Sequence, residues 1–200
     1  MDSVRSSSAA ARAAASTKIV IAGGFGVGKT TLVGSVSEIQ PLRTEALVTN
    51  ESEGVDDLEA VPSKSTTTVA MDFGRITLAE DLVLYLFGTP GQRRFWFMWD
   101  DLCMGAIGVI VLVDTARLSE AFSPVDYFEA KGLPFIVAVN QFEGGQVYPL
   151  QEVAAALALS PEVPIIDIDA RDRESAKRAL VRVTEYSLER LTQSLAMSAR

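Results

Sequence analysis

The stretch that decides the fold is Gly23-Gly24-Phe25-Gly26-Val27-Gly28-Lys29-Thr30, which fits the phosphate-loop pattern GxxxxGK[ST]. Its glycines let successive backbone N–H groups turn inward around a polyphosphate, Lys29 can reach the outer phosphates, and the Thr30 hydroxyl can ligate Mg²⁺. The β-branched run Lys18–Ala22 precedes the loop, and a helix over Thr30–Ile39 is expected to follow it. A loop between a buried strand and a helix indicates a nucleotide site rather than a turn without a ligand.

Outward from this loop, strand-like and helix-like segments alternate. Two strands, Thr67–Leu78 and Leu82–Phe87, are joined by a turn so short that they must pair antiparallel. Further strands are expected at Ile107–Val113, Phe135–Val139 and Pro164–Ile168, and further helices at Leu118–Ala130, Leu150–Leu159 and 172–198. This order predicts an α/β fold: a mostly parallel six-stranded sheet with one antiparallel strand and flanking helices. The stretch Gln40–Ser65 is expected to be a long irregular loop.

Composition limits what such a chain can do. With 200 residues, 48% of them hydrophobic, it can bury one α/β core; we expect a disordered tail over 1–15 and one domain over 16–200. Eighteen basic against 26 acidic residues argue against sequence-independent nucleic-acid binding. No histidine is present and Cys103 is alone, which excludes His-based triads, histidine metal sites and thiolate zinc sites. No apolar run reaches the ~18 residues of a membrane helix, so a cytoplasmic protein that meets membranes only through partners is expected.

Three further motifs choose among the many proteins that share a phosphate loop. The run Gly88-Thr89-Pro90-Gly91-Gln92 directly follows a strand and resembles the second switch of Ras-like GTPases, where the glycine amide senses the γ-phosphate and the glutamine orients the attacking water. The run Asn140-Gln141-Phe142-Glu143 resembles the guanine-specificity motif NKxD, and Asp169-Ala170-Arg171 resembles its SAK partner. Their order and spacing are similar to those of a small GTPase across nearly the whole chain.

A narrower resemblance is to the bacterial Ras-like group that includes the gliding-motility GTPase MglA and the GTPases of actinomycete conservon operons. It rests on the run from Ser65 to Gly74, on TPGQ at Thr89–Gln92 and on NQF at Asn140–Phe142. The T-x-x-x-D-F pattern in that run makes Thr68 the expected switch-one metal ligand, while Asp72 is expected to be structural.

The resemblance implies a molecular switch that binds GTP and GDP with Mg²⁺ and hydrolyses GTP slowly. Gln92 and Lys29 are its expected catalytic residues, and Thr30 and Thr68 its expected metal ligands. The residues expected to bind the nucleotide are Gly23, Gly24, Phe25, Gly26, Val27, Gly28, Lys29, Thr30, Thr31, Gly91, Asn140, Gln141, Glu143, Ala170 and Arg171.

Three positions depart from the pattern. Gly88 stands where Ras-like proteins have the aspartate that holds Mg²⁺ through water, and Gln141 replaces the lysine of NKxD. Glu143 replaces the aspartate that accepts two guanine N–H bonds, but it offers the same bidentate acceptor one methylene further out. Two alternatives therefore stay open: a nucleotide-dependent binding module without useful hydrolysis, which Gly88 favours, and an ATP-using P-loop protein.

Partner contacts are expected around the second switch. Five large apolar residues in a row, Phe95–Trp99, cannot all face one way, so part of the run is expected to meet a protein partner while the rest pins the segment to the sheet. The resemblance also implies a roadblock-fold regulator and a membrane-proximal histidine-kinase-like partner. Arg93 and Arg94 are weighed as an arginine finger in cis, and Asp114 as a helix cap.

Overall fold

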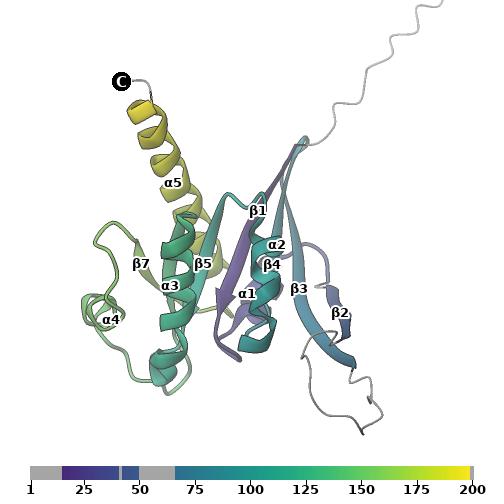
Figure 1. Ribbon diagram of the computed structural model, residues 1–200, viewed down its shortest axis with the longest axis horizontal. Coiled ribbons are helices and arrows are strands. Elements are labelled where there is room, and N and C mark those ends of the chain that lie inside the picture. The colour runs from purple at the N-terminus through teal and green to yellow at the C-terminus, as the bar shows by residue number, and fades with distance from the viewer. Residues whose placement is uncertain (1–14, 41, 50–65, 199–200) are drawn as a thin grey trace, which may run out of the picture.

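A computed structural model of the chain describes residues 15–40, 42–49 and 66–198, with the backbone alone over 42–49, 66–70 and 93–94. The described residues form one seven-stranded sheet in the order β2-β3-β4-β1-β5-β6-β7 (Figure 1). The strands are β1 (Ala15–Gly23), β2 (Leu42–Thr49), β3 (Thr66–Ala79), β4 (Leu82–Gly88), β5 (Gly108–Val113), β6 (Phe135–Asn140) and β7 (Ile165–Ile168). Strand β3 runs antiparallel to both β2 and β4, and the other pairs are parallel. The expected α/β architecture with one antiparallel strand is confirmed.

The sheet has one strand more than the six expected. Strand β2 lies within the stretch expected to be an irregular loop, and it pairs with β3 from Leu42 opposite Phe73 to Thr49 opposite Thr66. Its sequence, LRTEALVT, mixes polar and apolar residues, so local periodicity gave no strand signal. The long free edge of β3, which extends well beyond its pairing with β4, supplies the hydrogen bonds instead. The rest of the expected loop, 50–65, lies outside the described residues.

In the described part of the chain, four helices lie close to their expected positions, whereas the short helix Trp99–Cys103 was not expected. The helices are α1 (Lys29–Val36), α2 (Trp99–Cys103), α3 (Phe122–Lys131), α4 (Leu150–Ala156) and α5 (Arg173–Ser198), with 3₁₀ turns η1 (Arg93–Met98) and η2 (Thr115–Glu120). The single helix expected over Leu118–Ala130 is divided into η2 and α3. Pro124 then falls in the first turn of α3, where its missing N–H breaks no helical hydrogen bond.

Two apolar layers sandwich the sheet. On one face α1 and α5 pack against residues such as Ile21, Ile110 and Ile136. On the other face α2, α3 and α4 pack against Val20, Val111 and Val137. The alternation of faces along each near-continuous apolar strand explains why both sides are covered. Ala15, the last residue of the expected tail, is the first residue of β1 and pairs with Leu82 of β4. The rest of the expected tail lies outside the described residues.

Candidate functional site

The glycine-rich loop leaves β1 at its carboxyl end and turns directly into α1. Gly28 caps α1 with φ +108°, and a Cβ there would come within 2.6 Å of the Asn140 side chain. Gly23 has φ +133°, and a Cβ there would lie 2.5 Å from the carbonyl oxygen of Leu112. Both positions therefore require glycine on conformational and steric grounds. The loop encloses a cavity of about 360 Å³ that is also lined by Lys29 and Thr31.

Lys29 lies inside this loop. Lys29 is only 8% exposed. Its Nζ donates hydrogen bonds to the carbonyl oxygens of Gly23 and Gly24 at 2.9 and 2.6 Å. Burial lowers the pKa of Lys29 to about 8, although the nearby carboxylates of Asp72 and Glu120 oppose that shift. Among the described residues no carboxylate forms an ion pair with Lys29. A buried ammonium of this kind is stabilised by a bound anion.

A carboxylate and two hydroxyls gather beside the loop. Thr30 Oγ1 donates to Asp72 Oδ2 at 2.7 Å. In the β3–β4 ladder Asp72 lies opposite Gly88, and a Cβ on Gly88 would lie 3.0 Å from both Cβ and Oδ2 of Asp72. The Asp72 carboxylate therefore fills the space next to Gly88, where the sequence lacks an expected acid. Thr89 Oγ1, which lines the same cavity and is buried, has no hydrogen-bond partner among the described residues.

This arrangement differs from the sequence-based expectation for β3. Asp72 was expected to be structural, yet its carboxylate contacts the predicted metal ligand Thr30. Thr68 lies four residues along the same strand, about 13 Å away at the usual rise per residue, with its backbone opposite Leu47. The side chain of Thr68 is outside what the structure describes, so its metal role stays a prediction.

The predicted base-recognition residues meet at the ends of β6 and β7. Asn140 is 6% exposed; its Nδ2 donates to the carbonyl oxygen of Val27 at 3.0 Å, and its Oδ1 accepts from the Ala170 N–H at 2.9 Å. One side chain thereby ties the phosphate loop to the two loops expected to hold the base. Glu143 is exposed and pairs with Arg171 at 3.5 Å.

Two neighbours fix the edge of this region. Arg171 also pairs with Asp169 at 2.9 Å, which lowers the pKa of that carboxyl group. The backbone N–H of Gln141, whose side chain is half-buried, donates to the carbonyl oxygen of Ile168 at 2.7 Å. The five residues predicted for this region thus lie together, although they come from two separate segments: Asn140, Gln141, Glu143, Ala170 and Arg171.

The segment Gly88–Gln92, predicted to be the second switch, lies on the opposite side of the phosphate loop. A cavity of about 570 Å³ separates the loop from η1 and α3, and Gly91, Gln92 and Glu120 line it. A Cβ on Gly91 would lie 2.8 Å from Lys29 Nζ, so its backbone borders the place where an outer phosphate would sit. Gln92 is exposed at this border.

The family comparisons agree with this geometry. The sequence matches, over residues 21–190, the family described as conserved hypothetical ATP binding protein. The chain belongs to this family. It is also 29% identical, over 65% of its length and 73% of the relative, to an uncharacterized protein of Methanocaldococcus jannaschii. The G domain of the T. maritima FeoB iron transporter has a similar fold, with TM-score 0.59 and 16% identity over 86% of this chain and 99% of that one. The chain is a P-loop nucleotide-binding protein with the fold of a G domain.

Two charged residues of this P-loop protein were missed by the sequence analysis. Arg117 Nη1 donates to the carbonyl oxygen of Phe25 at 2.9 Å, and its Nε donates to Asp114 at 3.0 Å. Asp114 is the expected cap, since it accepts from the Ala116 N–H at 2.9 Å at the start of η2. Glu120 lies against Gly24, where an added Cβ would collide with its carboxylate. No local motif marks Arg117 or Glu120, because only packing of η2 brings them to the loop.

The aromatic run beside the second switch has a divided role. Phe95 and Trp99 are buried, and Trp99 stacks on Phe128 of α3 with ring centres 5.6 Å apart. Phe97, in contrast, is 63% exposed. Part of the run therefore pins the segment to the sheet, and Phe97 is left on the surface. The side chains of Arg93 and Arg94 are outside what the structure describes, so their role as a finger is not tested.

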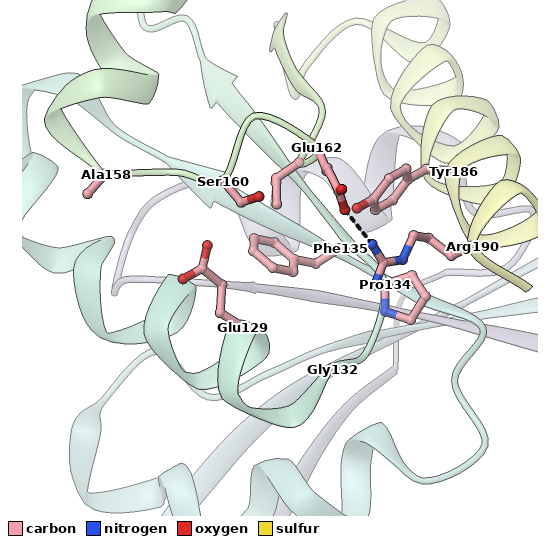
Figure 2. Close-up of a pocket in the computed structure, with 10 residues that line it drawn as sticks. Glu129, Gly132, Pro134, Phe135, Ala158, Ser160, Glu162, Tyr186 and Arg190 are labelled. Atoms are coloured by element: carbon pink, nitrogen blue, oxygen red, sulfur yellow. Dashed lines mark hydrogen bonds and ion pairs between the residues drawn. The ribbon is translucent and has the colours of Figure 1, made fainter. Parts of the chain in front are cut away.

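A further cavity of about 380 Å³ lies at the opposite ends of the strands (Figure 2). Phe135, at the start of β6, and Tyr186 of α5 line it, and Glu162 and Arg190 form an ion pair of 2.7 Å across one side. It has no glycine-rich loop and none of the sequence-predicted residues. The phosphate-loop cavity is therefore the candidate nucleotide site.

No helix among the described residues is long and apolar enough to span a membrane.

Proposed function

We propose that this P-loop protein is a guanine-nucleotide switch that binds GTP and GDP with Mg²⁺ and hydrolyses GTP slowly. The observation that carries the proposal is the bridge made by Asn140 between Val27 and Ala170. It holds the segments that carry the proposed base-binding residues next to the phosphate loop, and the exposed Glu143 carboxylate is the proposed acceptor for the base. A carboxylate there accepts the two N–H groups of guanine, whereas the adenine edge presents one amino donor and a ring acceptor.

The residues beside the loop fit a magnesium ion. Mg²⁺ prefers oxygen ligands. One cavity is lined by Thr30, Asp72 and Thr89, whose hydroxyl has no hydrogen-bond partner within the described ranges. Thr30 would ligate the ion directly, and Asp72 would hold it directly or through water, in the role that Gly88 cannot perform. When bound, the ion neutralises phosphate charge. This set supports metal-dependent nucleotide binding despite the missing aspartate at 88.

For hydrolysis, Gln92 is the proposed water-orienting residue. It follows Gly91, lines the 570 Å³ cavity and is exposed. Because phosphoryl transfer depends on positioning and charge neutralisation, turnover without a helper is expected to be slow. If single-turnover phosphate release is absent even with a candidate activator, the chain is instead a binding module without useful hydrolysis.

A second candidate is an ATP-binding protein, which membership of a family described as ATP binding favours. Competition of GTP and ATP for the same purified protein separates the two. Under the guanine proposal GTP displaces a labelled GDP probe and ATP does not. Glu143→Ala should weaken GTP by about tenfold or more, since a lost charged hydrogen bond typically costs roughly 1.5–3 kcal/mol. Preferential binding of ATP, unchanged in Glu143→Ala, would establish the second candidate.

The narrower membership and the partners remain proposals based on resemblance. The MglA-like and conservon-type assignment rests on the sequence motifs alone, as do the roadblock-fold and histidine-kinase-like partners. Exposure of Phe97 next to the second switch supports a protein contact there. Recruitment to a membrane would then follow from the partner, with the chain itself in the cytoplasm.

A further inference from the structure

The C-terminal half of α5 has no core of its own. Its first half buries residues such as Ala176, Val183 and Tyr186 against the sheet. From Leu188 to Ser198 every residue is exposed. Arg190, paired with Glu162 at 2.7 Å (Figure 2), is the last residue of α5 with an ion pair or hydrogen bond to another element in the part of the chain that the structure describes. The helix then continues past the sheet (Figure 1).

This projecting segment is not polar all round. Val181, Leu188, Leu191 and Leu195 are between 56% and 63% exposed. Their spacings of seven, three and four residues are those of the a and d positions of a heptad, and Thr184 and Ser198 occupy the two remaining positions. At 100° per residue this seam lies about 140° around the helix from the buried face. The seam therefore points away from the sheet, and three turns of helix with such a stripe are marginal in water without a partner.

We propose that this seam, Val181–Ser198, is the interface of an antiparallel dimer with a second copy of the chain. A 3–4 spacing selects another helix as the occupant, because knobs at a and d fit holes formed by a helix of the same period. The seam is complementary to itself: with Leu188 of one copy opposite Leu191 of the other, every a position meets a d position. Thr184 then meets Leu195, and Val181 meets Ser198, so no ionised side chain enters the interface.

Charge also favours this arrangement. The seam continues toward the start of α5 with Glu174 and Lys177, which pair with each other at 2.7 Å. Parallel helices would place each of them opposite its own copy, like charge against like, whereas the antiparallel register places both past Ser198, the last described residue of the other helix. Although the chain carries −8 overall, residues 181–198 hold two basic and two acidic side chains and are neutral. The phosphate loop lies at the other end of the strands, so the dimer leaves it open.

The first experiment measures the mass of the full-length protein in solution by sedimentation equilibrium across the micromolar range. Wild type should dimerise, and Leu191→Glu should self-associate at least about tenfold more weakly, because it removes an apolar contact and places a carboxylate in each half of the seam. Met197→Glu is the matched control: Met197 is 78% exposed on the same turns but lies about 160° from the seam. It should leave the dimer intact. Unchanged circular dichroism and nucleotide binding show that each variant is folded.

The second experiment tests the orientation with single cysteines in a Cys103→Ala background. Disulfides need Cα atoms within about 7 Å, and residues 184 of two antiparallel copies are about 16 Å apart along the axis. Oxidising a mixture of Thr184→Cys and Leu195→Cys proteins should give a covalent dimer of one copy of each, and either protein alone should give none. A wild type that is monomeric throughout, a dimer insensitive to Leu191→Glu, or cross-linking of Thr184→Cys with itself would each overturn the proposal.

Discussion

Replacing Lys29 with methionine should change the stability of the nucleotide-free protein in a way that depends on pH. Lys29 is 8% exposed, and burial brings its pKa to about 8, against 10.5 for an ordinary lysine. Its ammonium therefore remains charged at pH 7 at a cost to the folded state. Methionine has nearly the same length and carries no charge, so the variant removes that cost together with two hydrogen bonds to loop carbonyls.

The size of the effect follows from the two pKa values. A difference of one unit corresponds to about 1.4 kcal/mol, so holding the charged form in the folded protein costs roughly 3 kcal/mol at pH 7. Between pH 8 and 10.5 the unfolded chain keeps this proton while the folded protein loses it. The cost is therefore fully present below pH 8, decreases as the pH rises, and disappears above 10.5. At pH 10 less than about 1 kcal/mol of it remains.

The assay is urea unfolding of wild type and Lys29→Met at pH 7 and pH 10, in buffer with EDTA and without phosphate. Whatever the neutral amine contributes through packing and hydrogen bonds is the same at both pH values and cancels when the two differences are compared, whereas everything that depends on the proton is contained in the pKa shift. Relative to the variant, wild type should gain roughly 2–3 kcal/mol between pH 7 and pH 10. Lys177→Met, on the exposed side of α5, controls for general alkaline effects. A difference between wild type and Lys29→Met that is the same at both pH values would refute the desolvation argument.

Three further predictions concern bound nucleotide. Asp72→Asn should weaken GTP binding about tenfold or more when Mg²⁺ is present and little in EDTA, because it removes a carboxylate beside Thr30; an equal loss in both conditions, measured by titration of a fluorescent nucleotide, would assign Asp72 a purely structural role. Gln92→Leu should bind GTP normally and hydrolyse it much more slowly in single-turnover assays, since it acts in the transition state; equal rates with and without a partner would favour the binding module. Arg117→Ala should weaken the binding of GTP and of GDP alike, by about tenfold, because it removes the hydrogen bond to the Phe25 carbonyl oxygen that helps to hold the loop. Arg117→Lys should recover part of that loss in the same titration.

Local sequence determined the phosphate loop and most of the elements. The glycines from Gly23 to Gly28 permit backbone angles and close approaches that other residues would not, and that requirement is visible in the chain itself. Near-continuous apolar runs such as Gly108–Val113 can be satisfied only as strands covered on both faces. The short turn after Ala79 fixed the β3–β4 hairpin, but counting from the Ala79–Leu82 pair next to the turn would place Asp72 opposite Thr89. A bulge between Thr77 and Ala79 shifts the pairing by one residue and sets Asp72 opposite Gly88, so the role of Asp72 could not be read from the turn.

Tertiary structure decided what depends on contacts between distant segments. Strand β2 forms because the edge of β3 offers hydrogen bonds, although its own residues have no clear period. Arg117 reaches the Phe25 carbonyl across 92 positions in sequence, and Asn140 reaches Val27 across 113, so no local pattern could pair them. The sequence also left open which aromatic side chain of the run Phe95–Trp99 is exposed. In the structure α3 covers Trp99, and Phe97 lies on the surface. The physical reason is the same in each case: local sequence sets backbone preference and periodicity, whereas burial and partner choice are set by whichever elements the closed sheet brings together.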